Sequence, residues 1–385
     1  MNQTALRLFP LRNRHPGNGN GNGHGGQDAW QALRSAVGAR PSGIVQFPTR
    51  RSRLEDLVPG EKFLIVRKYG GLGDILIASM IFPMLADQYP GIRTVFACPR
   101  EYHPLFDGSG LELVAYEDVW ALHGMTDAIG GVRAKILERY DLIEDISFPC
   151  HTWQNFFIAY GGIDGNPALK WRNRLDMWAN WFGLSVRDPR TNIVIRRDEI
   201  EQARRLIEGI VGRNRPACLL APFSRSRTKS YPWFERLACR LADEGFAVLL
   251  LHPKRAPSSI PTLTHLPLRA MGAACAAADL VVSVDSAAFH WGGILRRPTV
   301  GIYNTNDGAT YARYYPTART VQACPTPCID ARYGPGNGTC PRHIQEKLPS
   351  LAGSEFQLSR CYAPATVEQV VLAARATLRS EAVLS

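Results

Sequence analysis

The stretch VRKYGGLGDILIAS (Val66–Ser79) gives the clearest indication of the fold. It ends an apolar run that begins at Phe63, passes through a glycine-rich turn, and places Asp74 directly before a second apolar run. Strand, glycine-rich turn and helix in this order are typical of a doubly wound α/β sheet. Such sheets bind ligands at the carboxyl ends of their strands, where helix N-termini also point. The stretch therefore predicts a parallel sheet with a site beside Asp74.

Strand-like and helical runs alternate along most of the chain, in two series. The first starts at Lys62 and includes TVFACP and YDLIEDIS, and the second follows Arg190, from NIVI and the helix DEIEQARRLIEGIV to PTVGIYN. This alternation predicts an α/β fold of two Rossmann-like doubly wound domains facing a central cleft. The expected parts are a disordered Gly/Asn-rich basic arm (1–58), two Rossmann-like domains (59–187 and 188–322), a cysteine-containing loop (323–362) and a C-terminal helix (363–385).

The net charge and the N-terminal sequence indicate which kinds of partner and which compartment suit the protein. The chain has 385 residues, and 45 Lys and Arg against 34 Asp and Glu give a net charge of +11, which suits anionic partners. Phosphorylated small molecules, acidic membrane surfaces and nucleic acid all qualify, and part of the excess lies in the arm. The N-terminus lacks a hydrophobic signal core, which predicts a cytoplasmic protein whose nine cysteines stay reduced.

The glycines and the aspartate of the opening stretch allow three interpretations. Gly71 and Gly73 permit a sharp turn and close approach of a ligand to the backbone. Asp74 is suited equally to capping the following helix and to acting as a catalytic carboxylate. A nicotinamide dinucleotide site is disfavoured, because Leu76 stands where that motif has its third glycine.

A second motif, VVSVDSAAFHWGGILRRPTVGIYN (Val281–Asn304), places Asp285 and Ser286 between a strand and a helix. The helix N-terminus and the Ser286 hydroxyl form a natural seat for a diphosphate. His290 follows one helical turn later on the same face, so it is either a ligand contact or a packed core histidine.

A third motif, PFSRSRTKSYPWFERLA, carries a hydroxyl and three cations on the loop after the strand CLLAPF. These residues are Ser224, Arg225, Arg227 and Lys229. A solvated basic loop is the plainer interpretation, but together with Asp285 and Ser286 at the same end of one sheet the loop favours phosphate binding.

These three motifs, in this order, resemble glycosyltransferase family 9, the heptosyltransferases, over roughly 62–371. The resemblance implies the glycosyltransferase type B fold and an inverting reaction that needs no catalytic metal. Matched by motif, Asp74 would be the general base, Lys229 would contact the diphosphate, and Asp285, Ser286 and His290 would form part of the nucleotide-sugar seat.

The resemblance also implies a function. A heptose-like sugar would pass from a nucleoside-diphosphate donor, such as ADP-heptose, to a hydroxyl of a glycan, a lipopolysaccharide core or a protein. Residues 59–187 would bind the acceptor and 188–322 the donor. Two departures leave a catalytically silent nucleotide-sugar-binding or assembly protein as the alternative. Ala287 stands where the family usually has glycine, and no carboxylate follows the strand AVLLLHP.

Four cysteines lie in a Pro- and Gly-rich part of the chain: Cys324, Cys328, Cys340 and Cys361. They are either independent thiols or a tetrahedral structural metal site. The segment resembles the four-cysteine iron-binding segment of the autotransporter heptosyltransferases, whereas thiolate chemistry alone equally allows zinc. We expect a structural or assembly role, in a possible homo-oligomer.

The stretch LKWRNRLDMWANWFGL (169–184) is aromatic and basic. A packed helix is favoured over a membrane-surface helix, because the apolar residues recur at helical spacing. The protein is therefore expected in the cytoplasm or against the inner face of the membrane, and nucleic acid is not an expected partner.

Overall fold

The computed structural model describes residues 49–51, 53–67, 71–118, 139–146, 173–224, 229–252, 258–304, 307–323, 345–346, 358–359, 362 and 366–384. The chain divides into two compact units, Met1–Pro48 and Thr49–Ser385, and the described residues all belong to the second. Most of the predicted arm (1–58) lies outside the described residues. Its last part belongs to the folded unit, since Leu54 of η2 (Leu54–Asp56) is buried in the core.

The N-terminal sheet is parallel and four-stranded, in the order β3-β2-β1-β4. Its strands are β1 (Lys62–Val66), β2 (Arg93–Cys98), β3 (Glu112–Ala115) and β4 (Leu142–Asp145). The strand order reverses between β1 and β4, which is where open α/β sheets bind ligands. The loop between β1 and the following helix carries the opening motif to that edge.

The C-terminal sheet is parallel and six-stranded, in the order β10-β9-β8-β5-β6-β7. Its strands are β5 (Ala217–Ala221), β6 (Ala247–Leu251), β7 (Thr262–Leu263), β8 (Leu280–Val284), β9 (Thr299–Tyr303) and β10 (Ala318–Gln322). This is the Rossmann order, with its reversal between β5 and β8. The second and third motifs follow β8 and β5, so both reach this reversal point.

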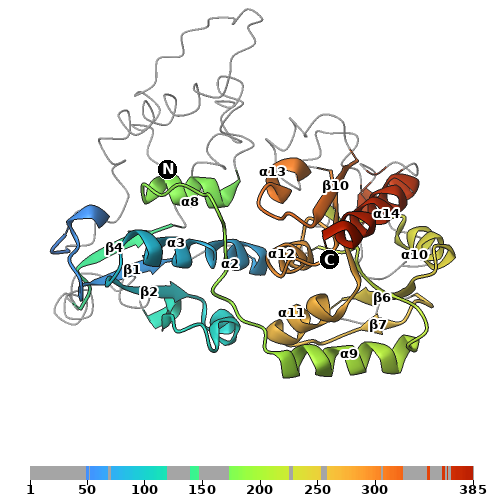
Figure 1. Ribbon diagram of the computed structural model, residues 1–385, viewed down its shortest axis with the longest axis horizontal. Coiled ribbons are helices and arrows are strands. Elements are labelled where there is room, and N and C mark those ends of the chain that lie inside the picture. Colours follow the sequence, from blue (N-terminus) through green and yellow to red (C-terminus); the bar gives the residue numbers. More distant parts are fainter. Residues whose placement is uncertain are drawn as a thin grey trace, which may run out of the picture. The chain divides into compact units, whose positions relative to one another are not determined.

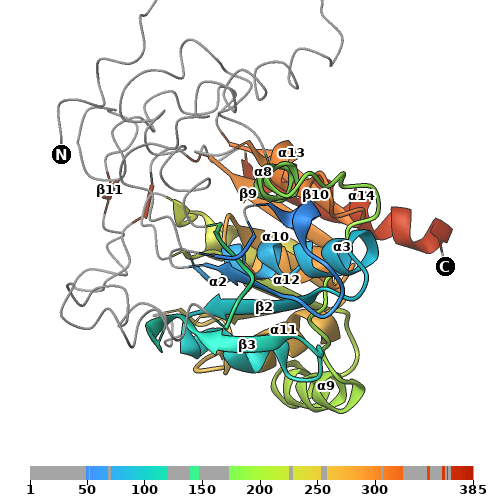
Figure 2. The same ribbon diagram turned by 90° about the vertical axis from the view of Figure 1, so that its left-hand side faces the viewer.

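Helices cover these sheets (Figures 1 and 2). Helices α2 (Leu72–Ala78), α3 (Ile81–Gln88) and α8 (Arg174–Trp181) pack on one another beside the N-terminal sheet. In the C-terminal part, α9 (Arg197–Val211), α11 (Leu268–Ala277) and α12 (Ala287–Ile294) form one group, and α10 (Phe234–Asp243) and α14 (Thr366–Leu384) another. The remaining elements are η3 (Arg100–Phe106), α13 (Gly308–Ala312) and the antiparallel pair β11 (Gln345–Glu346) and β12 (Leu358–Ser359).

Each face of the C-terminal sheet packs against its own core. Along β5, Cys218 and Leu220 belong to the cluster that includes α10 and α14, whereas Leu219 belongs to a cluster that includes α11 and α12. The latter cluster is continuous with Phe63 and Ile75 of the N-terminal part. Alternate residues of a strand point to opposite faces, so both faces are covered. The predicted fold class, two Rossmann-like α/β domains, is confirmed.

Two local expectations need correction. NIVI (192–195), expected as a strand, is irregular and leads into α9, although Ile193 is buried. The apolar run that starts at Ile75 forms two helices, α2 and α3, with a break at Ser79 and Met80. Pro83 explains the break, because proline lacks the N–H that a continuous helix needs but is tolerated in the first turn of a new one.

The stretch 169–184 forms α8 in its described part, and Leu175, Trp178 and Phe182 are buried in the core. The packed-helix interpretation is therefore correct for this part. Among the helices that the structure describes, none has the length and hydropathy required to cross a bilayer.

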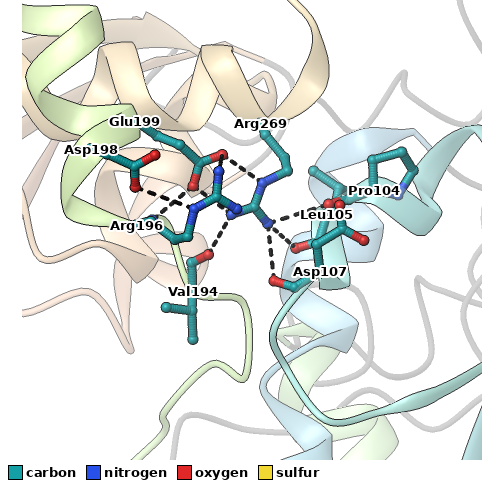
Figure 3. Close-up of polar contacts among 8 residues, drawn as sticks. All are labelled: Pro104, Leu105, Asp107, Val194, Arg196, Asp198, Glu199 and Arg269. Carbon is teal, nitrogen blue, oxygen red and sulfur yellow. Dashed lines mark hydrogen bonds and ion pairs between the residues drawn. The ribbon is translucent and has the colours of Figure 1, made fainter.

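Arg269 of α11 hydrogen-bonds to residues that follow β2 of the N-terminal sheet and to residues at the start of the C-terminal part (Figure 3). Its side chain is buried and donates from Nε and Nη2 to both carboxylate oxygens of Glu199 in α9, at 2.8 and 2.6 Å. The remaining bonds reach backbone carbonyls of Val194, Pro104, Leu105 and Asp107. The hydrogen bonds from Arg269 lower the pKa of Glu199 to about 2. The Arg269 guanidinium thus connects η3, α9 and the irregular segment before α9 that contains Val194 (the linking segment).

Candidate active site

Asp74 lies on the first turn of α2, at the carboxyl end of β1. Its carboxylate is buried, with the residue 7% exposed. The Gly71 backbone N–H donates to Asp74 Oδ2 at 3.1 Å, so the carboxylate does cap its own helix. Two ion pairs with arginines, which a helix cap does not require, add to this contact.

Arg67 and Arg174 form these ion pairs. Arg67 is fully buried, its Nη2 lies 3.4 Å from Asp74 Oδ2, and its guanidinium stacks 5.0 Å from the Trp178 ring centroid. Arg174, at the start of α8, pairs through Nη1 with Asp74 Oδ1. Two guanidinium groups stabilise the charged form of the carboxylate and fix its orientation.

His290 of α12 packs directly against the turn that precedes Asp74. A Cβ built on Gly73 would lie 2.7 Å from the Cδ2 atom of the His290 ring, a distance that real Cβ atoms do not show. Gly73 therefore serves the close packing of α2 on α12, and the ligand approach expected of it stays a prediction. For Gly71, open space surrounds the equivalent position, so that expectation stays a prediction.

The His290 ring is buried among aromatic side chains. Its Nδ1 lies 3.0 Å from the Tyr315 hydroxyl, and the rings of Phe289, Tyr311 and Tyr315 surround it. Burial lowers the pKa of His290 to about 4, against the opposing effect of Asp285. The ring is neutral near pH 7, so it adds no positive charge to a phosphate seat. Of its two interpretations, the packed core histidine fits this environment.

Lys229 and Asp285 form an ion pair at the carboxyl ends of β5 and β8. Lys229 Nζ donates to Asp285 Oδ2 at 2.6 Å. Asp285 is buried, whereas the lysine side chain is 26% exposed. The pair places an ammonium group at the point where the strand order reverses, as predicted for the donor side.

The other described donor-side residues flank this pair. Ser286 is the N-cap of α12, and its Oγ lies 2.9 Å from Ser283 Oγ. Ala287 is the first residue of α12. The Ser224 backbone N–H donates to Ser230 Oγ at 3.4 Å, ahead of Lys229.

Six of the predicted site residues lie outside the described residues: Arg225, Arg227, Cys324, Cys328, Cys340 and Cys361. In the parts of the chain that the structure describes, no cluster of three or more His, Cys, Asp or Glu side chains has a metal-binding arrangement. The predicted cysteine site stays a prediction.

The His290 ring lies between the part of the site that carries the predicted base and the part that carries the predicted diphosphate contact. Asp285, Arg174 and Lys229 all act electrostatically on His290, and Asp74 follows the glycine that touches it. The carboxyl ends of β1, β5 and β8 therefore contribute charged groups to one region. A carboxylate can abstract a proton, and a lysine ammonium group can stabilise the negative charge of a leaving phosphate.

Sequence reasoning missed the two arginines. Arg67 directly follows the buried strand β1, and a charge at that position of an apolar run is a usable signal. Arg174 lies 100 residues beyond Asp74, in a stretch considered only as a packed or membrane-surface helix, so only the fold brings the two together.

Comparison with known proteins finds a family model that matches part of the chain. The model of glycosyltransferase family 9 (heptosyltransferase) matches residues 169–332. Residues 169–332 are therefore similar to this family, and the predicted resemblance is confirmed. A search of curated proteins finds no match.

Solved structures agree on the fold, which is glycosyltransferase type B. A glycosyltransferase family 9 protein from Veillonella parvula is 16% identical, with 84% of this chain and 98% of that chain covered and a TM-score of 0.56. The ADP-heptose lps heptosyltransferase II of E. coli is 16% identical, with 83% and 99% covered and a TM-score of 0.53. The dodecameric iron-containing heptosyltransferase TibC, in complex with ADP-D-beta-D-heptose, is 14% identical, with 84% and 77% covered and a TM-score of 0.56; TibC comes from enterotoxigenic E. coli H10407.

Proposed function

We propose that this chain, which is similar to glycosyltransferase family 9 over residues 169–332, is an inverting glycosyltransferase of the heptosyltransferase type. It moves a heptose-like sugar from a nucleoside-diphosphate donor to an acceptor hydroxyl, without a catalytic metal. The observation that carries the proposal is the position of Asp74 on the first turn of α2, which packs through Gly73 on α12, together with the Lys229–Asp285 ion pair beside the N-terminus of α12.

Asp74 is the proposed general base. Its carboxylate takes the proton of the acceptor hydroxyl while the hydroxyl oxygen bonds to the anomeric carbon. The bond from that carbon to the donor phosphate breaks on the opposite face, and its electron pair leaves with the nucleoside diphosphate. Arg67 and the Gly71 N–H hold Oδ2, and Arg174 holds Oδ1, so the carboxylate is ionised and oriented before the acceptor arrives.

Lys229 is the proposed contact of the leaving diphosphate. Its ammonium group has three donors and gives one to Asp285, so others can bond to phosphate oxygens. Ser286 and the N-terminus of α12 contribute dipoles of the same sign. The solved structure of TibC is a complex with ADP-D-beta-D-heptose, and we take ADP-heptose as the first candidate donor.

The remaining parts of the proposal concern assembly and acceptor. Four thiolates suit iron or zinc, so Cys324, Cys328, Cys340 and Cys361 would hold a structural metal. TibC is dodecameric and iron-containing, which supports a homo-oligomer here. A glycan, a lipopolysaccharide core and a protein hydroxyl are the candidate acceptors, and the site of action is the cytoplasm or the inner face of the membrane.

The test starts with a panel of ADP and UDP sugars, and NAD as the control for a dinucleotide site. We expect ADP-heptose to raise the melting temperature and then to support transfer or slow donor hydrolysis. Asp74→Ala should reduce turnover by about 10²–10⁴-fold while donor binding remains. Normal turnover of Asp74→Ala would overturn the assignment of the base. Donor binding without any turnover in the wild-type chain would favour the catalytically silent alternative.

A further inference from the structure

Three polar residues at the start of α8 contact two other helices. They are Asn173, Arg174 and Asp176. Arg174 pairs with Asp74 of α2. Asn173 Nδ2 donates to the Thr310 carbonyl of α13 at 2.9 Å. Asp176 accepts hydrogen bonds from Arg313 at 3.0 Å and from the Tyr314 hydroxyl. We call the bonds of Asn173 and Asp176 the α8–α13 contact. Arg174, whose guanidinium pairs with the proposed base, thus lies between these two residues in the sequence.

This arrangement fixes the backbone of Arg174 on both sides. Asn173 Oδ1 also accepts from the Leu175 N–H at 2.8 Å, so one side-chain amide both caps α8 and holds α13. Leu175 and Trp178 are buried, which anchors the inner face of the helix. A long side chain such as arginine loses rotamer freedom when it is ordered, and a fixed backbone reduces that cost. The position of the guanidinium therefore depends on the α8–α13 contact.

Stability alone does not account for the placement of Arg174. Its Nε is buried and, among the described residues, has no hydrogen-bond partner. A buried donor without a partner costs free energy. Native structures keep few such groups, and functional sites are where they are expected. What the Arg174 side chain gains at this cost is its ion pair with Asp74.

We propose that Arg174 is a positioning residue for the base, and that the α8–α13 contact sets its position. This inference rests on the proposed role of Asp74. With the contact made, Arg174 stays at Asp74 Oδ1 and the carboxylate is ionised and oriented. With the contact broken, the first turn of α8 is released, and of its partners among the described residues Asp74 keeps Arg67 and the Gly71 N–H. Because α13 packs on β9 and β10 of the C-terminal sheet, the donor-side domain controls the base of the other domain.

The direct readout is the titration of the Asp74 carboxyl carbon by NMR, assigned with Asp74→Asn. Among the described residues, Arg67 after β1 and Arg174 on α8 form ion pairs with this carboxylate, and the titratable ring that packs against Gly73 is His290 on α12. Removing a cation destabilises the charged carboxylate. Arg174→Gln should therefore move the titration midpoint to higher pH, and Asp176→Asn should move it in the same direction by less.

A double variant shows whether the two substitutions shift the Asp74 titration midpoint through one shared interaction or independently. If both residues act through one guanidinium, Arg174→Gln combined with Asp176→Asn gives the midpoint of Arg174→Gln alone. Tyr314→Phe removes one partner of Asp176 without changing a charge, and it serves if Asp176→Asn lowers the melting temperature too far. The matched control is Asp87→Asn, which breaks an exposed ion pair with Arg190 and should leave the midpoint unchanged.

Kinetics give the second readout once transfer is detected. Arg174→Gln and Asp176→Asn should lower kcat, by about tenfold or more for Arg174→Gln, with an unchanged KM for the donor, since misplacement of a catalytic group acts on the chemical step. An unchanged midpoint in both Asp176→Asn and Tyr314→Phe, with a shifted midpoint in Arg174→Gln, would overturn the coupling. The NMR titration needs no activity, so failure of the proposed transfer reaction leaves this result readable.

Discussion

Two arginines of this protein bind carboxylates in different ways. Arg269 donates from all three guanidinium nitrogens, to both oxygens of Glu199 and to four backbone carbonyls (Figure 3). Arg174 pairs with Asp74 through Nη1, while its buried Nε lacks a partner among the described residues. The first arginine is saturated with hydrogen bonds and the second is not.

This difference distinguishes an arginine that stabilises the fold from one that positions a candidate site residue. A fully satisfied buried network fixes a single arrangement of the elements that it joins, which here are α9, α11, η3 and the linking segment. An incompletely satisfied one keeps donors that a substrate or a moving helix can use. We therefore assign Arg269 to the stability of the joint between the domains and Arg174 to the chemistry of Asp74.

The largest expected effect comes from replacing each arginine by methionine. Arg269→Met removes the bidentate partner of the part-buried Glu199 carboxylate, which keeps Arg196, and it also removes the donor of four backbone carbonyls. Together these losses should cost about 3 kcal/mol. Arg174→Met should cost only about 1 kcal/mol, because Asp74 keeps Arg67 and the Gly71 N–H. Urea unfolding measures both, with transfer activity as the second readout. Equal losses of stability in the two variants would contradict the comparison.

The fold, and the places of the candidate site residues along it, could be predicted from the sequence for the same reason. Buried parallel strands and glycine-rich turns are local patterns, and the carboxyl ends of β1, β5 and β8 follow from them. Asp285 directly follows β8, and Asp74 and Lys229 lie in the segments that follow β1 and β5, so their placement at these strand ends could be predicted.

The partners of these residues could not be predicted in the same way. Arg174 and Asp74 are joined only by the packing of α8 on α2, which leaves no periodic signal in the sequence. The ring of His290 could be a ligand contact or a core residue until the distance from its Cδ2 to a Cβ on Gly73 was known. NIVI failed as a strand because tertiary contacts override local propensity in a linking segment, where the Val194 carbonyl bonds Arg269.

The imidazole ring of His290, which lies between α2 and α12, provides the next test. Unlike the two arginines, it is uncharged in the folded protein near pH 7. The folded-state pKa of His290, about 4, is below the usual histidine value of about 6.5. The unfolded chain therefore binds a proton that the folded chain refuses, and stability should fall as the pH falls from about 6.5 to about 4. The loss is on the order of 3 kcal/mol.

Chemical unfolding across this pH range measures the effect. His290→Gln removes the titrating group and should flatten this part of the curve. His265→Asn is the matched control, since His265 is exposed and asparagine tolerates its positive φ of 54°. A wild-type curve that stays flat between pH 6.5 and 4 would show that the ring is accessible to protons in the folded protein.

The smallest expected effect decides where the Lys229–Asp285 pair belongs in this comparison. Lys229 is partly exposed and gives one described hydrogen bond to Asp285, so it resembles Arg174 in keeping donors for a ligand. Lys229→Met should weaken ADP-heptose binding by about tenfold, or about 1.4 kcal/mol, while unfolding changes little, because part-exposed pairs contribute about 0–1 kcal/mol. Calorimetric titration with ADP-heptose measures the affinity, and Lys62→Met, which breaks the Lys62–Glu112 pair, is the control. A large loss of stability with unchanged donor affinity would instead group Lys229 with Arg269, as a residue that holds the fold together.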